Sequence, residues 1–207
     1  MLQRVSFAVA GTEVEGILHL PDGEIVGGVL EMGGGESEHG AFICDALAAA
    51  GVAALRFAFR VQRDTPAGLA DAAGAVRLLR AHPAVPQRVG VVGHSQGGLV
   101  AAVAAGRDSR VRVAAVLAAP AEREYTRGLR PIAELSRTRA RVLLVYAGAD
   151  ELVPPQDAQR YASVLRQAGV VHRVVTIEGA DHQFTAPEHR VRMLEVLTDW
   201  VRSSLAD

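Results

Sequence analysis

A serine in the segment Gly93-His94-Ser95-Gln96-Gly97-Gly98 has the surroundings of a catalytic nucleophile. The pattern G-x-S-x-G follows the apolar run Val89–Val92 and precedes the alanine-rich stretch Leu99–Ala105, which predicts a buried strand, a tight turn and a helix. Such a turn strains the serine backbone, and flanking glycines remove Cβ atoms that would collide with strand and helix. The first N–H groups of the helix would face negative charge formed beside the hydroxyl. Taken alone, the pattern is equally compatible with an ordinary packed turn.

Three further features of matching chemistry follow other predicted strands. The glycines 33–35 end one strand and could supply backbone N–H groups to an oxyanion hole, although they could also form a flexible loop. Asp150 and His182 follow two later strands. Ligands of open parallel sheets gather outside the carboxyl ends of the strands, so we expect these features and Ser95 to share one rim of the sheet.

Strands that alternate with helices predict a mostly parallel sheet of about eight strands, covered by helices on both faces. An antiparallel hairpin at the N-terminus, turning at Gly11-Thr12, would lie at one edge of this sheet. The connection between residues 120 and 141 is too short for a sizeable lid domain, and we expect residues 1–207 to form a single domain. The expected strands are 3–9, 14–20, 25–30, 52–57, 89–93, 111–119, 142–146 and 170–177, and the expected helices are 41–50, 64–82, 99–105, 156–167 and 187–205.

Composition excludes several kinds of chemistry. The chain of 207 residues has a formal net charge of −1 and no run of like charges, so neither nucleic acid nor a membrane surface is an expected partner. The sequence contains no lysine, which excludes a Ser-Lys dyad and Schiff-base catalysis, and no asparagine, which excludes a Cys-His-Asn site. The single cysteine, Cys44, lies on a predicted apolar helix face and suggests a buried small side chain rather than a nucleophile.

Over essentially its whole length the sequence resembles the α/β-hydrolase superfamily, on the strength of three segments, and it is most similar to small lidless esterases related to dienelactone hydrolase. These segments are 93–98, 150–154 and 179–184. The resemblance implies Ser95 as nucleophile, His182 as general base and acid, and Asp150 as the acid that orients the imidazole. It also implies the backbone N–H groups of Gln96 and Gly34 as oxyanion donors. Met32 stands where many members have histidine, and the cysteine nucleophile of some dienelactone hydrolases is absent here.

Alternatives remain for several of these roles. Asp181 adjoins His182, and Glu151 follows Asp150, so either could act as the orienting acid. Arginines between residues 120 and 141 are either a solvated surface or a site for a substrate carboxylate. Four residues are candidates for substrate contact: Gly33, Gly35, His39 and Tyr125. The remaining histidines are expected to be structural or exposed: His19, His82, His94, His172 and His189.

These features together predict a serine hydrolase that cleaves carboxylic esters or thioesters of fairly small acyl groups. A peptidase of the same fold and a non-catalytic binding module are the alternatives. We expect a small-molecule ester as partner, and neither a metal nor an organic cofactor. The N-terminus lacks the apolar core of a signal peptide and no stretch is long enough to span a bilayer, which predicts a cytoplasmic protein.

Overall fold

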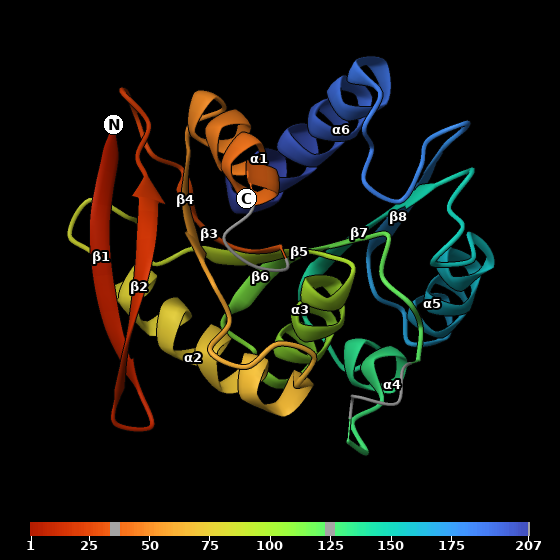
Figure 1. The fold of residues 1–207 in the computed structure, drawn as a ribbon, viewed down its shortest axis with the longest axis horizontal. Helices are drawn as coiled ribbons and strands as arrows, with labels where there is room; N and C mark the ends of the chain where they lie inside the picture. The colour runs from red at the N-terminus through yellow and green to blue at the C-terminus, as the bar shows by residue number, and fades with distance from the viewer. Residues whose placement is uncertain (34–37, 123–126, 207) are drawn as a thin grey trace.

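The computed structural model describes residues 1–33, 38–122 and 127–206, which form an eight-stranded sheet with helices on both faces (Figure 1). The strand order is β1-β2-β4-β3-β5-β6-β7-β8, and neighbouring strands from β4 onward run parallel. The fold is the one predicted. The strands are β1 Leu2–Val9, β2 Thr12–His19, β3 Gly27–Gly33, β4 Val52–Phe57, β5 Val89–His94, β6 Val111–Leu117, β7 Arg141–Ala147 and β8 His172–Ile177. The helices are α1 Glu38–Ala49, α2 Thr65–Ala81, α3 Gln96–Arg107, α4 Pro131–Leu135, α5 Gln156–Gln167 and α6 Pro187–Ala206.

The predicted N-terminal hairpin is confirmed, with β1 at the sheet edge and β2 antiparallel to β4. Its turn lies at Ala10 and Gly11, one residue earlier than predicted. Both residues have positive φ, 49° and 79°, which matches the right-handed twist of the two strands. Alternate residues of the hairpin, such as Phe7 and Val14, are buried, so one face packs on the core and the other is left for solvent.

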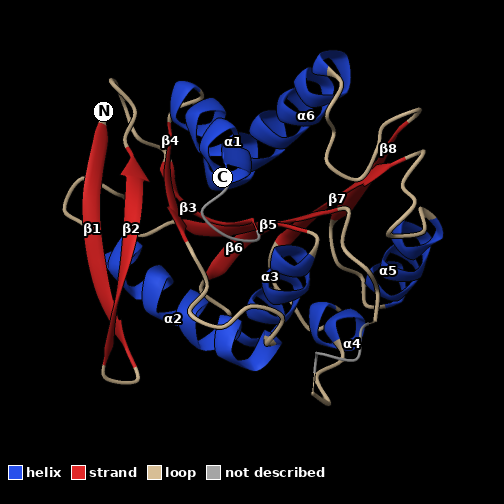
Figure 2. Ribbon diagram, viewed as in Figure 1, coloured by secondary structure: helices blue, strands red, loops and turns tan. Residues whose placement is uncertain are grey.

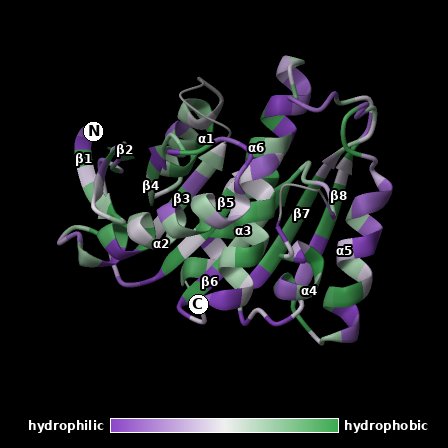
Figure 3. Ribbon diagram, turned by 60° about the horizontal axis from the view of Figure 1, so that its bottom comes forward, coloured by the Kyte–Doolittle hydropathy of each residue, from purple (hydrophilic) through white to green (hydrophobic). Residues whose placement is uncertain are grey.

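The two faces of the sheet carry separate hydrophobic clusters. Helices α1 and α6 cover one face, and α2, α3, α4 and α5 cover the other (Figures 1 and 2). Successive residues of a strand point to opposite faces, so Val29 packs with the α1 and α6 cluster while Leu30 joins the other. Figure 3 shows hydrophobic colour along β7 and mixed colour on the outer helix α5.

A local sequence signal explains the start of α2. The Asp64 carboxylate caps α2 by accepting a hydrogen bond from the Ala67 N–H at 3.0 Å, and a proline follows in the first turn. Helix α1 begins at Glu38, three residues before the expected start. Helix α4 was not predicted. It packs on α3, where Gly106 has no Cβ and the backbone carbonyl of Glu134 therefore comes close.

Cys44 is fully buried in α1, as expected, and burial raises the pKa of its thiol well above the usual range. Within the ranges given above, the helices are all too short or too polar to cross a membrane.

Strand β3 carries a buried carboxyl group that interrupts its apolar run. Glu31 is 2% exposed, and burial raises the pKa of its side chain from 4.5 to about 7. The Gly33 backbone and the Arg56 guanidinium favour the charged form but do not offset the loss of water. The folded protein therefore holds this proton up to a higher pH than the unfolded chain does.

We predict that the free energy of unfolding falls as the pH rises from about 4.5 to about 7. A proton bound more tightly by the folded state stabilises that state at low pH, and this stabilisation is lost as Glu31 ionises. Each pKa unit corresponds to about 1.4 kcal/mol, so Glu31 alone accounts for a decrease of about 3 kcal/mol. Urea unfolding of the native protein and of Glu31→Gln at several pH values measures this contribution. An equal slope in both proteins would contradict it.

Candidate active site

The strand-to-helix turn after β5 holds Ser95 in a backbone conformation that non-glycine residues rarely adopt. Its φ is 53° and its ψ is −116°, and its N–H donates to the Leu117 carbonyl at 2.9 Å. Ser95 is partly exposed, and its hydroxyl has no hydrogen-bond partner among the residues described. The turn therefore presents a free hydroxyl at the carboxyl end of the sheet, as the G-x-S-x-G pattern predicted.

Close backbone contacts explain the glycines around Ser95. A Cβ on Gly97 would overlap the backbone carbonyl of Met32 in β3, and a Cβ on Gly93 would overlap the backbone of Gly97. Gly98 lies against Ala119, where a Cβ would be only 2.5 Å from the Ala119 side chain. The helix α3 can therefore begin directly above β5 and beside β3 only if these positions lack side chains.

His182 and Asp150 meet although 32 residues separate them in the sequence. The distance from His182 Nδ1 to Asp150 Oδ2 is 2.8 Å, and the Asp150 side chain is fully buried. The other carboxylate oxygen, Oδ1, accepts hydrogen bonds from the backbone N–H groups of Leu152 and Val153, both at 2.8 Å. These contacts fix the carboxylate, which in turn fixes the orientation of the imidazole ring.

The alternative acids lie differently. The Asp181 carboxylate is exposed and accepts hydrogen bonds from the Gln183 and Thr185 backbones and the Thr185 hydroxyl, which stabilise its own loop. These bonds also hold the pKa of Asp181 below its usual value. Glu151 is exposed as well. The structure thus brings Asp150, rather than either neighbour, to His182.

His94, the residue directly before Ser95, contacts the loop that carries His182. Its Nε2 lies 2.7 Å from the His182 carbonyl oxygen, and the two imidazole rings are 4.8 Å apart. Phe184, buried with a φ of 50°, packs edge-on against His94. His94 is buried and supports the loop, which agrees with the structural role expected from the sequence.

The predicted oxyanion groups are only partly described. Gln96 is the first residue of α3, where the N–H groups have no carbonyl of their own helix to bind. Gly33 ends β3 and pairs in register with His94, so the end of β3 lies beside the Ser95 turn. Gly34, Gly35, Tyr125 and the side chain of His39 lie outside the described residues.

A search against protein-family models gives a match over residues 48–199 to the dienelactone hydrolase family. The chain belongs to this family. Residues of the Ser95 turn, the Asp150 loop and the His182 loop all lie within the matched part. No curated protein matches the chain.

Solved structures of similar fold include members of this family and other hydrolases. A dienelactone hydrolase from Anabaena variabilis is 23% identical, with a TM-score of 0.82 over 99% of this chain and 98% of that one. Est1E from Butyrivibrio proteoclasticus is 18% identical, with a TM-score of 0.84 over 99% of both chains. The acylaminoacyl peptidase of Pyrococcus horikoshii is 16% identical with a TM-score of 0.84, and the match covers all of this chain but 42% of the peptidase.

Two polar residues beside this rim were missed from the sequence. Glu31 was placed after the end of a strand, whereas it lies inside β3, and Arg56 of β4 is its cross-strand neighbour. The available signal was a charged residue in each of two apolar strands, which is unusual unless the charge has a partner or a ligand.

We predict that Gly97→Ala severely destabilises this dienelactone hydrolase family member. The added methyl group would displace the end of β3, and overpacking of this kind costs about 3 kcal/mol or more when backbone must move. Thermal unfolding followed by circular dichroism measures the loss. Gly23→Ala is the matched control because no atom lies within 4 Å of the added Cβ. Similar melting temperatures for both variants would show that the turn tolerates a side chain.

Proposed function

We propose that the protein is a serine esterase that hydrolyses carboxylic esters or thioesters of fairly small acyl groups through an acyl-enzyme. The observation that carries this proposal is the Asp150–His182 pair, whose loop contacts the residue next to Ser95. Membership of a hydrolase family and the fold of the known esterases support a hydrolytic reaction.

In the proposed acylation step, Ser95 Oγ attacks the ester carbonyl carbon while His182 Nε2 takes the hydroxyl proton. Asp150 accepts the Nδ1–H hydrogen bond, keeps the ring in the required tautomer and stabilises the imidazolium. The carbonyl oxygen becomes negative, and backbone N–H groups of Gln96 and Gly34 are the proposed donors to it. One such donor contributes about 2.7–4 kcal/mol to transition-state stabilisation.

The tetrahedral intermediate then breaks its bond to the alcohol or thiol, which leaves with the proton from His182. Water attacks the acyl-serine in the same way, His182 again removing a proton, and the carboxylic acid is released as Ser95 regains its hydrogen. The buried Asp150 side chain and the positive φ of Ser95 support this proposed pathway.

Hydrolysis of p-nitrophenyl acetate tests the nucleophile. We expect Ser95→Ala and His182→Ala each to lose essentially all turnover while their circular dichroism spectra stay native. Ser203→Ala is the matched control, because this exposed serine on α6 is remote in sequence from the site and its hydroxyl only donates to the Trp200 carbonyl. Native-like turnover in Ser95→Ala would overturn the proposal.

A second prediction concerns the orienting acid. In Asp150→Asn, the backbone N–H groups of Leu152 and Val153 select the amide oxygen, so the amide NH₂ is presented to His182 Nδ1. This favours the wrong imidazole tautomer, and we expect kcat to fall by roughly 10²–10⁴. Asp181→Asn serves as the comparison and should change kcat by less than a few-fold. The reverse order of effects would assign the orienting role to Asp181.

The peptidase alternative is tested with the same proteins. Acylated amino acid amides should be poor substrates relative to the corresponding esters. Faster cleavage of the amides would favour a peptidase over an esterase.

A further inference from the structure

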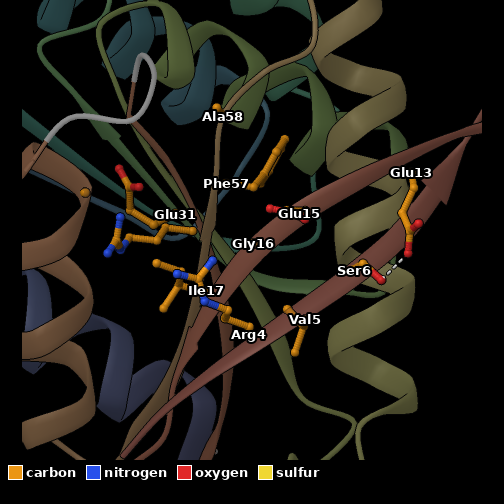
Figure 4. A pocket seen from close by; sticks show the side chains of 12 residues that line it. Arg4, Val5, Ser6, Glu13, Glu15, Gly16, Ile17, Glu31, Phe57 and Ala58 are labelled. Atoms are coloured by element: carbon orange, nitrogen blue, oxygen red, sulfur yellow. Dashed lines mark hydrogen bonds between the residues drawn. The ribbon is translucent and has the colours of Figure 1, made fainter.

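A groove of about 540 Å³ lies across β1, β2, β4 and β3 beside the start of α1 (Figure 4). It is within the size range of small-molecule sites in proteins. The groove has both charged and apolar walls, and the residues of the proposed catalytic triad are not among those that line it.

One cross-strand row forms the floor of the groove. Arg4 pairs with Ile17, Ile17 with Arg56, and Arg56 with Glu31 in the registers of the four strands. Directly opposed residues point to the same face of a sheet, so all four side chains lie on the face that α1 covers. Three of the four are charged, on a face that elsewhere is largely apolar.

The carboxyl group of Glu31 is only partly satisfied, although the Gly33 backbone and the Arg56 guanidinium favour its charged form. Its Oε1 is buried and makes no hydrogen bond. Space for the carboxyl comes from Gly33 and Gly40, since a Cβ at either position would overlap one of its oxygens. A buried carboxyl oxygen without a hydrogen bond is unfavourable for folding, so the Glu31 Oε1 atom at the groove favours a ligand there.

Arg56, in contrast, is held in place. Its Nε donates to His19 Nε2 at 3.0 Å, and His19 Nδ1 bonds to Asp45 Oδ1 at 2.8 Å. This chain fixes the guanidinium through one nitrogen and leaves the two terminal NH₂ groups for other partners. Within the described part of the chain, neither Arg56 nor Arg4 has an ion-pair partner.

The charges lining the groove balance one another. Arg4 and Arg56 are matched by Glu13 and Glu15, while Glu31 gives up its proton only near pH 7. A balanced site does not select a charged ligand, but it offers hydrogen-bond donors and acceptors side by side. A hydroxyl group both donates and accepts, so several hydroxyls satisfy such a surface, and Ile17 and Phe57 offer apolar contact to a carbon skeleton.

The groove is also close to the proposed reaction site. Glu31 is two residues from Gly33, about 7 Å along the strand, and Gly33 pairs with His94, the residue before Ser95. The groove and the Ser95 turn therefore lie at the ends of the neighbouring strands β3 and β5.

We propose that this groove binds the hydroxyl-rich alcohol part of the ester, such as a sugar or other polyol, with Glu31 and Arg56 as its specificity-determining residues. This inference rests on the proposed esterase activity and names the class of substrate.

The test compares three acetate esters: 6-O-acetylglucose, cyclohexylmethyl acetate, which has a similar ring without hydroxyls, and O-acetylglycolate, whose alcohol part carries a carboxylate. We expect kcat/KM to be highest for the glucose ester. In Glu31→Met the ratio of kcat/KM for the glucose ester to that for cyclohexylmethyl acetate should fall at least tenfold, mainly through KM. The control Glu195→Met, an exposed glutamate on α6, should leave the ratio unchanged.

The melting temperature separates binding from a structural role. Burial of the Glu31 carboxyl is unfavourable and leaves its Oε1 without a hydrogen bond, so Glu31→Met should keep or raise the melting temperature, whereas loss of a structural glutamate would lower it. A wild-type preference for cyclohexylmethyl acetate or O-acetylglycolate, or an unchanged ratio in Glu31→Met, would overturn the proposal.

Direct binding distinguishes failure of this inference from failure of the esterase proposal. If no ester is hydrolysed, the esterase proposal fails, and saturation-transfer NMR with D-glucose and with cyclohexylmethanol still tests the groove. Glucose binding that is lost in Glu31→Met supports the site, and absence of glucose binding to the native protein contradicts it.

Discussion

The close approach of the Ser95 turn to the end of β3 is the contact on which the rest of the structure depends. Gly97 lies so near the Met32 carbonyl that no side chain fits between them. This contact lets α3 start directly after β5, with Ser95 at a positive φ, and puts the turn beside the end of β3. The proposed nucleophile and the strand that carries Glu31 are thereby brought together by one backbone contact.

The Asp150–His182 pair depends on a second contact, between the loops that follow β7 and β8. β7 and β8 are adjacent, so the loops after them meet, and Asp150 reaches His182. Two backbone N–H groups hold the aspartate, and His94 holds the histidine loop through a carbonyl oxygen. Neither of these supporting contacts is evident from residue types, because each needs the loop conformation and the packing of strands far apart in the sequence.

Regular patterns made most of the fold predictable. Alternation in the hairpin, apolar runs in the central strands and the glycines of the Ser95 turn each reflect one local constraint. Helix α4 was missed because five residues give little periodicity and its packing depends on Gly106 of α3. The extension of β3 through Glu31 was missed because no local sequence pattern predicts a buried carboxyl group. The carboxyl is tolerated there only because Gly33 and Gly40 leave space for it.

Localisation of a covalent adduct tests whether Ser95 is an activated nucleophile. A fluorophosphonate reacts with an activated serine, and peptide mass spectrometry identifies the modified residue. We expect one adduct, on Ser95, which disappears when His182 is replaced by alanine. An adduct on another residue, or none on the folded native protein, would contradict the assignment of Ser95 as an activated nucleophile.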